Sequence, residues 1–244
     1  MPEGPSIVIL KELVQQFVGK TILAVEGNSK IDIHRLKYLK VISFKSWGKH
    51  FLICFSNFTL KVHFLMFGTY RINEKKDNAT PRLSLEFENG EINLYSCSIK
   101  FLEGDINLHY DWAADVMNEQ WNPKKAKQKL KEIRDNMICD ALLEQEIFSG
   151  VGNIIKNEVL YRMRIHPESI VENIPLRKLN QTIKECSLYS FEFLEWKRNY
   201  VLRDHWLVHT KKICQNCQIP LQLKYTGNKK RRSFFCSNCQ ILYK

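Results

Sequence analysis

The chain has 244 residues, with 37 Lys and Arg against 26 Asp and Glu, a formal net charge of +11 and a pI near 9.2. Hydrophobic residues make up 44% of it and Gly and Pro number only 10 and 7, which excludes peptide scaffolds, collagenous chains and low-complexity chains. The longest apolar runs are far shorter than the roughly 20 residues that a membrane-spanning helix needs. We therefore expect a folded, soluble protein without a membrane partner, built from one large or a few small domains.

The positive charge is concentrated at the C-terminal end of the chain. Residues 206–244 contain eight Lys or Arg and no Asp or Glu. A concentrated basic segment favours a polyanionic partner, and nucleic acid is the commonest polyanion. A merely solubilising tail is the alternative, but the same segment also carries aromatic residues and four cysteines.

The first residues, Met1–Pro5, have neither a basic flank nor an apolar stretch, so we expect no secretory signal and a reducing, cytoplasmic or nucleoid location. Residues 5–18 place apolar side chains at helical spacing, and Gly19 follows where a helix C-cap is expected. From about residue 21 to 110, short apolar or alternating runs separated by turn residues predict an antiparallel β-sandwich or barrel. The expected strands are Thr21–Val25, Val41–Phe44, Phe51–Phe55, Phe58–Phe64, Leu83–Phe87 and Glu91–Tyr95.

Beyond Trp112 the periodicity of the apolar residues becomes helical. Helices are expected over Pro123–Arg134, Met137–Phe148, Asn153–Arg164 and Leu176–Lys197. The sequence therefore predicts an α+β chain of several domains. These are a β-rich domain at 1–112, a linker at 113–122, a helical domain at 123–205 and a small cysteine-bearing domain at 206–244.

Four cysteines near the C-terminal end form two chelating pairs. Eighteen residues separate Cys214-Gln-Asn-Cys217 from Cys236-Ser-Asn-Cys239, a spacing typical of a tetrahedral four-thiolate zinc site. Two disulfides are the alternative, but a reducing compartment keeps thiolates available. We expect a structural Zn²⁺, because four thiolates leave no open coordination position and so short a segment has too small a core to fold alone. The other cysteines are expected in the core: Cys54, Cys97, Cys139 and Cys186.

Between the cysteine pairs, Gly227-Asn228 predicts the turn of a β-hairpin that the metal would hold at its base. Lys229–Arg232 would then project as a basic fork. A run of charges is usually a solvated face. An arginine at the tip of a rigid hairpin is better suited to a phosphate, because a guanidinium binds phosphate oxygens through two parallel hydrogen bonds.

The motif Gly150-Val-Gly-Asn153 precedes an apolar-periodic run and predicts the N-terminus of a helix. Asn153 is a favoured N-cap, and the glycines permit close backbone approach to a ligand. Helix N-termini bind anions well, although a plain capped helix is the alternative when this motif is taken alone. Together with the basic hairpin, it favours a chain with two phosphate sites that follow DNA.

The start Met1-Pro2-Glu3 can supply a nucleophile. Once the initiator Met is removed, Pro2 is a free secondary amine. Its pKa is about 8, compared with about 10.4 for lysine, so a larger fraction of it is unprotonated and nucleophilic at neutral pH. Such an amine can attack C1′ of a deoxyribose while the carboxyl of Glu3 gives a proton to the sugar ring oxygen. A helix-starting proline is the commoner role of Pro2, and Lys49, on a turn entering a strand, is by itself an ordinary surface lysine.

Further motifs accompany these over the whole chain: Pro2-Glu-Gly-Pro5, Gly48-Lys49, His63-Phe-Leu-Met-Phe-Gly68, Leu94-Tyr-Ser-Cys-Ser98, Asp115-Val-Met117, Gly150-Val-Gly-Asn153 and Arg231-Arg-Ser-Phe-Phe-Cys236. In this order and spacing they resemble the formamidopyrimidine-DNA glycosylase/endonuclease VIII family of base-excision repair enzymes. The resemblance implies a catalytic N-terminal helix and β-sandwich, a helix-two-turn-helix module and a C-terminal β-hairpin zinc finger. It also implies a monomer that binds damaged double-stranded DNA, with single-stranded DNA left open.

By the same resemblance, Pro2 is the Schiff-base nucleophile and Glu3 the acid in base removal. Lys49 contacts a phosphate and assists β-elimination. Asn153 and Arg231 grip the phosphates beside the lesion, and Arg231 assists δ-elimination.

Enzymes that act on a base take it out of the stack, and apolar side chains fill the gap. The resemblance points to Leu65, Met66 and Phe67 for this role, with Met66 favoured and a buried core position as the alternative. Two features favour the endonuclease VIII branch, which acts on oxidised pyrimidines such as thymine glycol. One is the motif Tyr95-Ser-Cys-Ser98. The other is the short distance of eighteen residues between Glu195 and Cys214, which leaves too little chain for a long loop over 8-oxoguanine.

Two other functions remain open at this point. One is removal of 8-oxoguanine or formamidopyrimidine by the same chemistry, and the other is non-catalytic binding of DNA or RNA on the same fold. The chain also departs from the family pattern at Leu65, where the family has a polar wedge residue, and at Ala113-Ala114, which replaces Gly-Pro.

Overall fold

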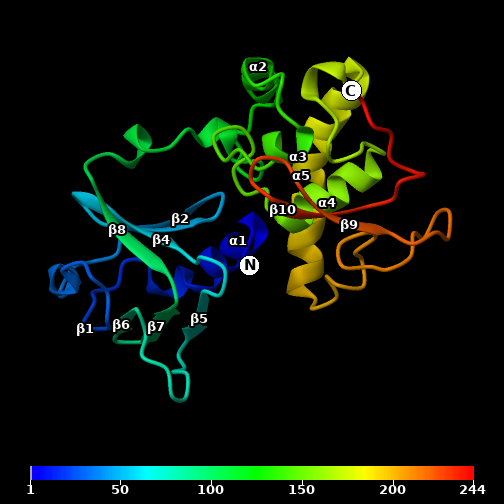
Figure 1. Cartoon of the computed structure of the whole chain (residues 1–244). Helices are drawn as coiled ribbons and strands as arrows, with labels where there is room; N and C mark the ends of the chain where they lie inside the picture. The colour runs from blue at the N-terminus through cyan, green and yellow to red at the C-terminus, as the bar shows by residue number, and fades with distance from the viewer. Residues whose placement is uncertain (1) are drawn as a thin grey trace. The chain divides into compact units, whose positions relative to one another are not determined.

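The structure is a computed structural model that describes residues 2–244, so the expected removal of Met1 lies outside the described residues. The chain divides into two compact units, residues 1–110 and 111–244 (Figure 1). None of the helices in residues 2–244 combines the length and the apolar character that a membrane crossing requires.

The first unit consists of one helix and two antiparallel sheets of four strands each. Helix α1 (Gly4–Leu13) is followed by a 3-10 turn, η1 (Gln15–Phe17), and by Gly19 with φ 78°. One sheet has the order β1 (Ala24–Glu26), β6 (Leu83–Phe87), β7 (Gly90–Tyr95), β5 (Thr69–Ile72). The other has the order β2 (Ser43–Trp47), β3 (His50–Cys54), β4 (Phe58–His63), β8 (Ser98–Glu103).

Apolar side chains from both sheets and from α1 form one core. On the helix, Ile7 and Leu10 are fully buried in it, and α1 packs against β2 and β3. Burial of one face of α1 therefore fixes the position of the residues at its start, Pro2 and Glu3.

All six strands expected from the sequence are present, with ends shifted by up to three residues. Two further strands, β5 and β8, were not expected. Both lie at the edge of a sheet, where one neighbour suffices, so neither needs the strongly apolar pattern of a central strand. The α+β fold class with its antiparallel sandwich is confirmed.

The second unit contains the helices α2 (Pro123–Glu132), α3 (Ile138–Ala141), α4 (Asn153–Arg162) and α5 (Leu176–Arg198) and a hairpin of β9 (Gln222–Thr226) and β10 (Arg231–Phe235). Its core is formed by apolar residues from all four helices. The helix expected over Met137–Phe148 is only the short α3 followed by turns. After α3, the carbonyl of Glu146 accepts a hydrogen bond from Lys129 Nζ at 2.6 Å.

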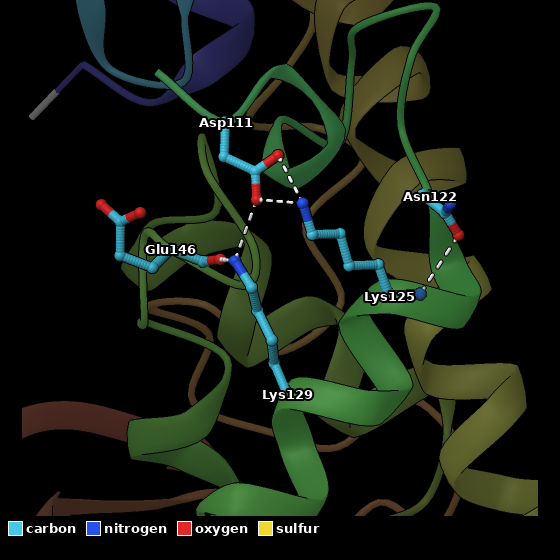
Figure 2. A network of polar contacts seen from close by, with 5 residues as sticks. All are labelled: Asp111, Asn122, Lys125, Lys129 and Glu146. Carbon is cyan, nitrogen blue, oxygen red and sulfur yellow. Dashed lines mark hydrogen bonds and ion pairs between the residues drawn. The ribbon is translucent and has the colours of Figure 1, made fainter. Parts of the chain in front are cut away.

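Two lysines of α2 hold the first residue of the second unit (Figure 2). Lys125 Nζ lies 2.8 Å from Asp111 Oδ2, and Lys129 Nζ lies 3.0 Å from the same oxygen. Asn122 caps the helix that carries them by accepting hydrogen bonds from the backbone N–H groups of Lys124 and Lys125, at 3.0 and 3.1 Å. The segment that enters the second unit is therefore attached to α2 by a charged, partly buried network.

This network predicts a pH-dependent contribution to stability. Burial of Asp111 opposes its ionisation, but the ammonium groups of Lys125 and Lys129 outweigh burial and hold the pKa of Asp111 below its usual value. A carboxyl with a depressed folded pKa stabilises the protein above its unfolded pKa, and that stability is lost as pH falls through the folded pKa. Asp111→Asn should therefore lower the free energy of unfolding at pH 7 by about 1 kcal/mol, measured by urea denaturation.

The matched control is Asp135→Asn, because that carboxylate is 82% exposed and lies 3.9 Å from Arg134. At pH 7 this control should unfold like the wild type, and the difference between Asp111→Asn and the wild type should shrink as the pH falls through the depressed pKa of Asp111. Equal stability of Asp111→Asn and wild type at pH 7 would contradict the role given to Asp111.

Candidate active site and metal centre

The N-terminal pair lies directly before α1. Glu3 is the N-cap residue in an extended conformation, with φ −116° and ψ 175°, and its carbonyl accepts a hydrogen bond from Ser6 N at 2.9 Å. Its side chain makes no capping hydrogen bond to the helix, yet the residue is only 1% exposed. A carboxyl group this buried is held in one place, and Pro2 is the residue next to it.

Lys49 lies in the turn between β2 and β3, where Gly48 has φ 51°. Its charge acts on two histidines that face each other across β3 and β4, His50 and His63, whose rings lie 5.5 Å apart. Burial, then Lys61, His63 and Lys49, lower the pKa of His50 to about 3. Burial, then Lys49, also lower the pKa of His63, so both imidazoles are neutral at physiological pH. Sequence reasoning gave no role to this pair.

The loop between β4 and β5 exposes three consecutive apolar side chains. Leu65, Met66 and Phe67 are 51%, 55% and 82% exposed. Phe64 anchors the loop in the core, and at Gly68 a Cβ atom would lie 2.7 Å from Phe64 Cα, so only glycine allows this close return. The alternative that these residues belong to the core is therefore excluded, and the loop presents an apolar tip.

The start of α4 differs by one residue from the expectation. Gly152 is the N-cap and Asn153 is the first helical residue, so the cap residue itself has no side chain that could cap the helix. The side chain of Asn153 is consequently not used as a cap, and its buried Oδ1 has no hydrogen-bond partner among residues 2–244. Gln145 holds the preceding turn by accepting from Gly150 N at 3.2 Å and donating to the carbonyl of Val151 at 3.1 Å.

The structure brings the four C-terminal cysteines together. Their Sγ atoms all lie within 4.8 Å of one another, with Cys214 to Cys239 at 3.7 Å, Cys217 to Cys236 at 3.4 Å and Cys217 to Cys239 at 3.6 Å. A tetrahedron with Zn–S bonds of about 2.3 Å has S–S edges of about 3.8 Å. The donor set and its spacing therefore fit a four-thiolate metal site. The alternative of two disulfides does not hold in this structure, because all eight cysteines are free.

Neighbouring groups donate hydrogen bonds to these sulfurs, as is usual around metal thiolates. Asn216 Nδ2 lies 3.3 Å from Cys239 Sγ, and Cys239 N lies 3.4 Å from Cys236 Sγ. The hydroxyl of Tyr161, on α4, lies 3.1 Å from Cys214 Sγ. Zn²⁺ held here would supply no reaction chemistry, because the four residues fill its coordination sphere, and it would tie the chain ends of the hairpin together.

The hairpin turn is held more firmly than the sequence suggests. Thr226 pairs with Arg231, so residues 227–230 form the turn, and the carboxylate of Asp140 accepts hydrogen bonds from Asn228 N at 2.6 Å and Lys229 N at 3.2 Å. At Gly227, with φ 69°, a Cβ atom would lie 2.3 Å from Asp140 Oδ2.

The expectation that all of Lys229–Arg232 projects from the hairpin is therefore corrected at its first residue. Lys229 Nζ lies 2.7 Å from Glu144 Oε1 and is turned back into an ion pair. Arg231, the first residue of β10, follows directly after this anchored turn.

A buried polar run on α4 attaches the hairpin, and sequence reasoning missed it. Lys156 and Asn157 lie on α4 one turn after Asn153. Lys156 Nζ donates to Ser233 Oγ at 2.8 Å and to the carbonyl of Arg232 at 3.2 Å. The side chain of Asn157 also contacts β10, accepting from Phe234 N at 3.4 Å. The sequence signal was the Lys-Asn-Glu run, which lies between Ile155 and Val159 in the middle of the helix.

Glu158, the third residue of this buried polar run on α4, holds the segment that leads to the cysteines. Its two carboxylate oxygens accept hydrogen bonds from Leu207 N, Val208 N and His209 N at 2.9, 3.0 and 2.7 Å. Burial raises the pKa of Glu158, and these three N–H groups oppose the rise. Burial, then the charges of Lys156 and Arg232, lower the pKa of His209 to about 4, so His209 is neutral at physiological pH.

The expected site residues thus fall into two sets. Pro2, Glu3, Lys49 and the exposed loop belong to the first unit. In the second unit, α4 packs against β10, so the structure places Asn153 and Arg231 on two elements in direct contact.

Two family models match the chain. The formamidopyrimidine-DNA glycosylase N-terminal domain matches residues 1–102, and the formamidopyrimidine-DNA glycosylase H2TH domain matches residues 112–188.

Similar curated proteins come from bacteria and vertebrates. Mouse endonuclease 8-like 3 is 27% identical over 79% of this chain, and bovine endonuclease 8-like 2 is 32% identical over 74% of it. This chain covers 33% and 58% of those two proteins, respectively, so it spans only about a third of the endonuclease 8-like 3 protein. Formamidopyrimidine-DNA glycosylase of Ureaplasma parvum is 25% identical, with 98% of this chain and all of that protein covered.

Solved structures show the same fold. Lactococcus lactis formamidopyrimidine-DNA glycosylase, non-covalently bound to DNA containing an AP site, superposes with a TM-score of 0.86 at 20% identity, over 98% of this chain and 99% of that one. The same bacterial protein in a complex with DNA containing an oxidized pyrimidine gives a TM-score of 0.85 at 20% identity, over 98% of this chain and 99% of that one.

The cysteine cluster predicts one tightly bound zinc ion per chain. Cys236→Ser should reduce the zinc content, because a serine hydroxyl replaces one of four thiolates, and the hairpin should lose protection from amide exchange. Elemental analysis and hydrogen exchange measure the two effects. Cys186→Ser serves as the control, since Cys186 is a buried core cysteine far from the cluster in sequence. Unchanged zinc content in Cys236→Ser would contradict the assignment.

Proposed function

Because the chain belongs to the formamidopyrimidine-DNA glycosylase/endonuclease VIII family, we propose that it is a DNA glycosylase of base-excision repair that also cleaves the strand at the resulting abasic site. The observation that carries this proposal is the arrangement at the start of α1. There a buried carboxyl group, Glu3, directly follows a proline that becomes the first residue once Met1 is removed.

In the proposed reaction, the secondary amine of Pro2 attacks C1′ of the damaged nucleotide and the bond from C1′ to the base breaks. The base leaves with the bonding electron pair and takes up the proton that the amine loses. Glu3 donates a proton to the sugar ring oxygen, so the ring opens and an iminium links Pro2 to the sugar. Loss of a proton from C2′ then expels the 3′ phosphate, and a second elimination expels the 5′ phosphate. Water finally releases the sugar fragment and restores the amine.

Three basic or polar groups are proposed to hold the phosphates beside the lesion. Lys49 contributes from the first unit, and Asn153 and Arg231 contribute from the second. The contact of α4 with β10 supports this assignment for Asn153 and Arg231, since one packed pair of elements carries both. Zn²⁺ bound to the four cysteines would keep the base of the Arg231 hairpin closed.

The exposed apolar loop is proposed to fill the space that the everted base leaves. Its three side chains lie outside the core, and Met66 is flexible enough to fit an irregular gap between bases. The stiff anchoring by Phe64 and Gly68 supports an insertion role, because a loose loop would lose conformational entropy on insertion.

Oxidised pyrimidines are the proposed substrates. The similarity to endonuclease 8-like proteins supports this choice. So does the short path from α5 to Cys214, in which Leu207, Val208 and His209 are bonded to Glu158 and therefore cannot form a long mobile cap. Removal of formamidopyrimidines or 8-oxoguanine is the second candidate, which the match to the Ureaplasma parvum protein over nearly the whole chain favours.

The test is a trapping experiment with sodium borohydride, which reduces an iminium to a stable cross-link. Duplexes with thymine glycol, dihydrouracil, 8-oxoguanine or an abasic site are incubated with the protein, and both cross-link and strand cleavage are measured. We expect both products, with the pyrimidine lesions cleaved faster than 8-oxoguanine. Tight binding without cross-link or cleavage would instead identify a non-catalytic binding protein, and intact mass measurement shows whether Met1 has been removed.

Two substitutions separate the roles of the N-terminal residues. Glu3→Gln should slow base excision by roughly 10²- to 10⁴-fold, the usual contribution of one general acid, while a pre-formed abasic site is still cleaved. Pro2→Gly should retain part of the strand cleavage, because a terminal amine is still present. Equal loss of both reactions in Glu3→Gln would contradict its role as the acid, and the exposed Glu12, replaced by Gln, is the control.

A further inference from the structure

The register of the second sheet aligns basic side chains across its strands. Lys45 on β2 pairs with Leu52 on β3, Leu52 with Lys61 on β4, and Lys61 with Lys100 on β8. Directly paired residues point to the same side of a sheet. Three lysines therefore occupy one row that runs across the whole sheet, and we call it the lysine row.

This row lies on the side of the sheet that faces away from the sandwich core. The adjacent row, Phe44, Ile53, Leu60 and Phe101, belongs to the core between the sheets. Since successive residues of a strand point to opposite faces, the lysine row is on the other face. Accordingly, Leu52 is absent from the core cluster although it is fully buried, and Lys100 is exposed.

No negative charge balances the centre of the row. Lys61 and Lys100 lie directly opposite each other, a like-charge arrangement that destabilises an antiparallel pair. Burial, then the charge of Lys100, lower the pKa of Lys61, and no carboxylate in the described part of the chain forms an ion pair with either ammonium group. Residues 33–73 contain seven Lys or Arg and no Asp or Glu.

The next row along the strands leads to the candidate site. Two residues from the lysine row, on the same face, Trp47, His50 and His63 lie opposite one another, and the hydroxyl of Tyr110 contacts His50 Nδ1 at 3.2 Å. Two residues of strand span about 6.6 Å. Lys49 lies in the turn beyond this second row and lowers the pKa of both histidines through its charge. Along the strands, the order is therefore Lys49 in the turn, then the row of Trp47, His50 and His63, and then the lysine row. Together they form one positively charged face.

We propose that this face binds the phosphate backbone of the nucleic acid on one side of the damaged nucleotide, with Lys61 and Lys100 as a pair of phosphate contacts. The proposal rests on the proposed function, because it extends the track of the same DNA beyond Lys49. A bound phosphate group would reduce the repulsion between the two ammonium groups. The direct pairing of Lys61 with Lys100 therefore lowers stability only when no DNA is bound. The contacts are to the backbone, so they add affinity without sequence preference.

The experiment compares the salt dependence of DNA binding. A duplex with a stable abasic-site analogue is titrated at several KCl concentrations with wild type, with K61Q/K100Q and with K20Q/K75Q. Glutamine keeps much of the aliphatic stem. The control variant removes the same total charge from two lysines that are paired with carboxylates, Lys20 with Glu88 and Lys75 with Glu91. Each phosphate contact contributes about 0.9 to the slope of log K against log salt.

For K61Q/K100Q we expect the slope to fall by about 1.8 and Kd at 0.15 M salt to rise at least tenfold. The K20Q/K75Q control and the charge-retaining K61R/K100R variant should keep the wild-type slope. A wild-type slope in K61Q/K100Q would overturn this inference alone, whereas a wild-type protein without salt-dependent DNA binding would overturn the proposed function itself.

A second readout does not depend on folding of the variants. Wild-type protein is acetylated with a lysine-reactive reagent, with and without the same DNA, and the modified lysines are identified by mass spectrometry. DNA should protect Lys61 and Lys100 several-fold and leave Lys75 unprotected. Equal labelling of Lys61 and Lys100 with and without DNA would count against the proposal.

Discussion

The second unit depends on one constraint, which is that polar groups buried on α4 must find hydrogen-bond partners. Lys156, Asn157 and Glu158 are almost fully buried, and a buried charge without partners would cost several kcal/mol. Their partners are the backbone and side chains of β10 and of residues 207–209. Helix and hairpin are consequently one piece, and the cysteine cluster, whose Cys214 is touched by Tyr161 of the same helix, belongs to it.

Arg231 gains its position from constraints at both ends of the hairpin. The cysteine cluster closes the base, and the carboxylate of Asp140 holds the turn so closely that a side chain at Gly227 would clash with it. A guanidinium on a two-stranded hairpin alone would lose conformational freedom on binding a phosphate. Fixing both ends reduces that loss before any ligand arrives, as a binding site on rigid elements requires.

The sequence predicts those parts of the fold and site that follow from local patterns, but not those that depend on contacts between distant residues. The cysteine cluster and the sandwich strands follow from local spacing, because chelating pairs and apolar runs are local patterns. The lysine row depends on strand register, since Lys45, Lys61 and Lys100 come to lie in one row only when β2, β3, β4 and β8 are paired. The partners of Lys156 and the role of Gly152 as N-cap are set by tertiary contacts, so in the sequence a buried lysine looks like a surface one.

The exposure of Met66 links the protein to the chemistry that produces its proposed substrates. Met66 is 55% exposed in the loop between β4 and β5, so the oxidants that damage bases can reach this residue. Conversion to the sulfoxide would replace a flexible apolar side chain with a polar, chiral one at the point meant to enter the base stack. Oxidation of Met66 would then weaken the proposed insertion of the loop, and methionine sulfoxide reductases would restore the thioether.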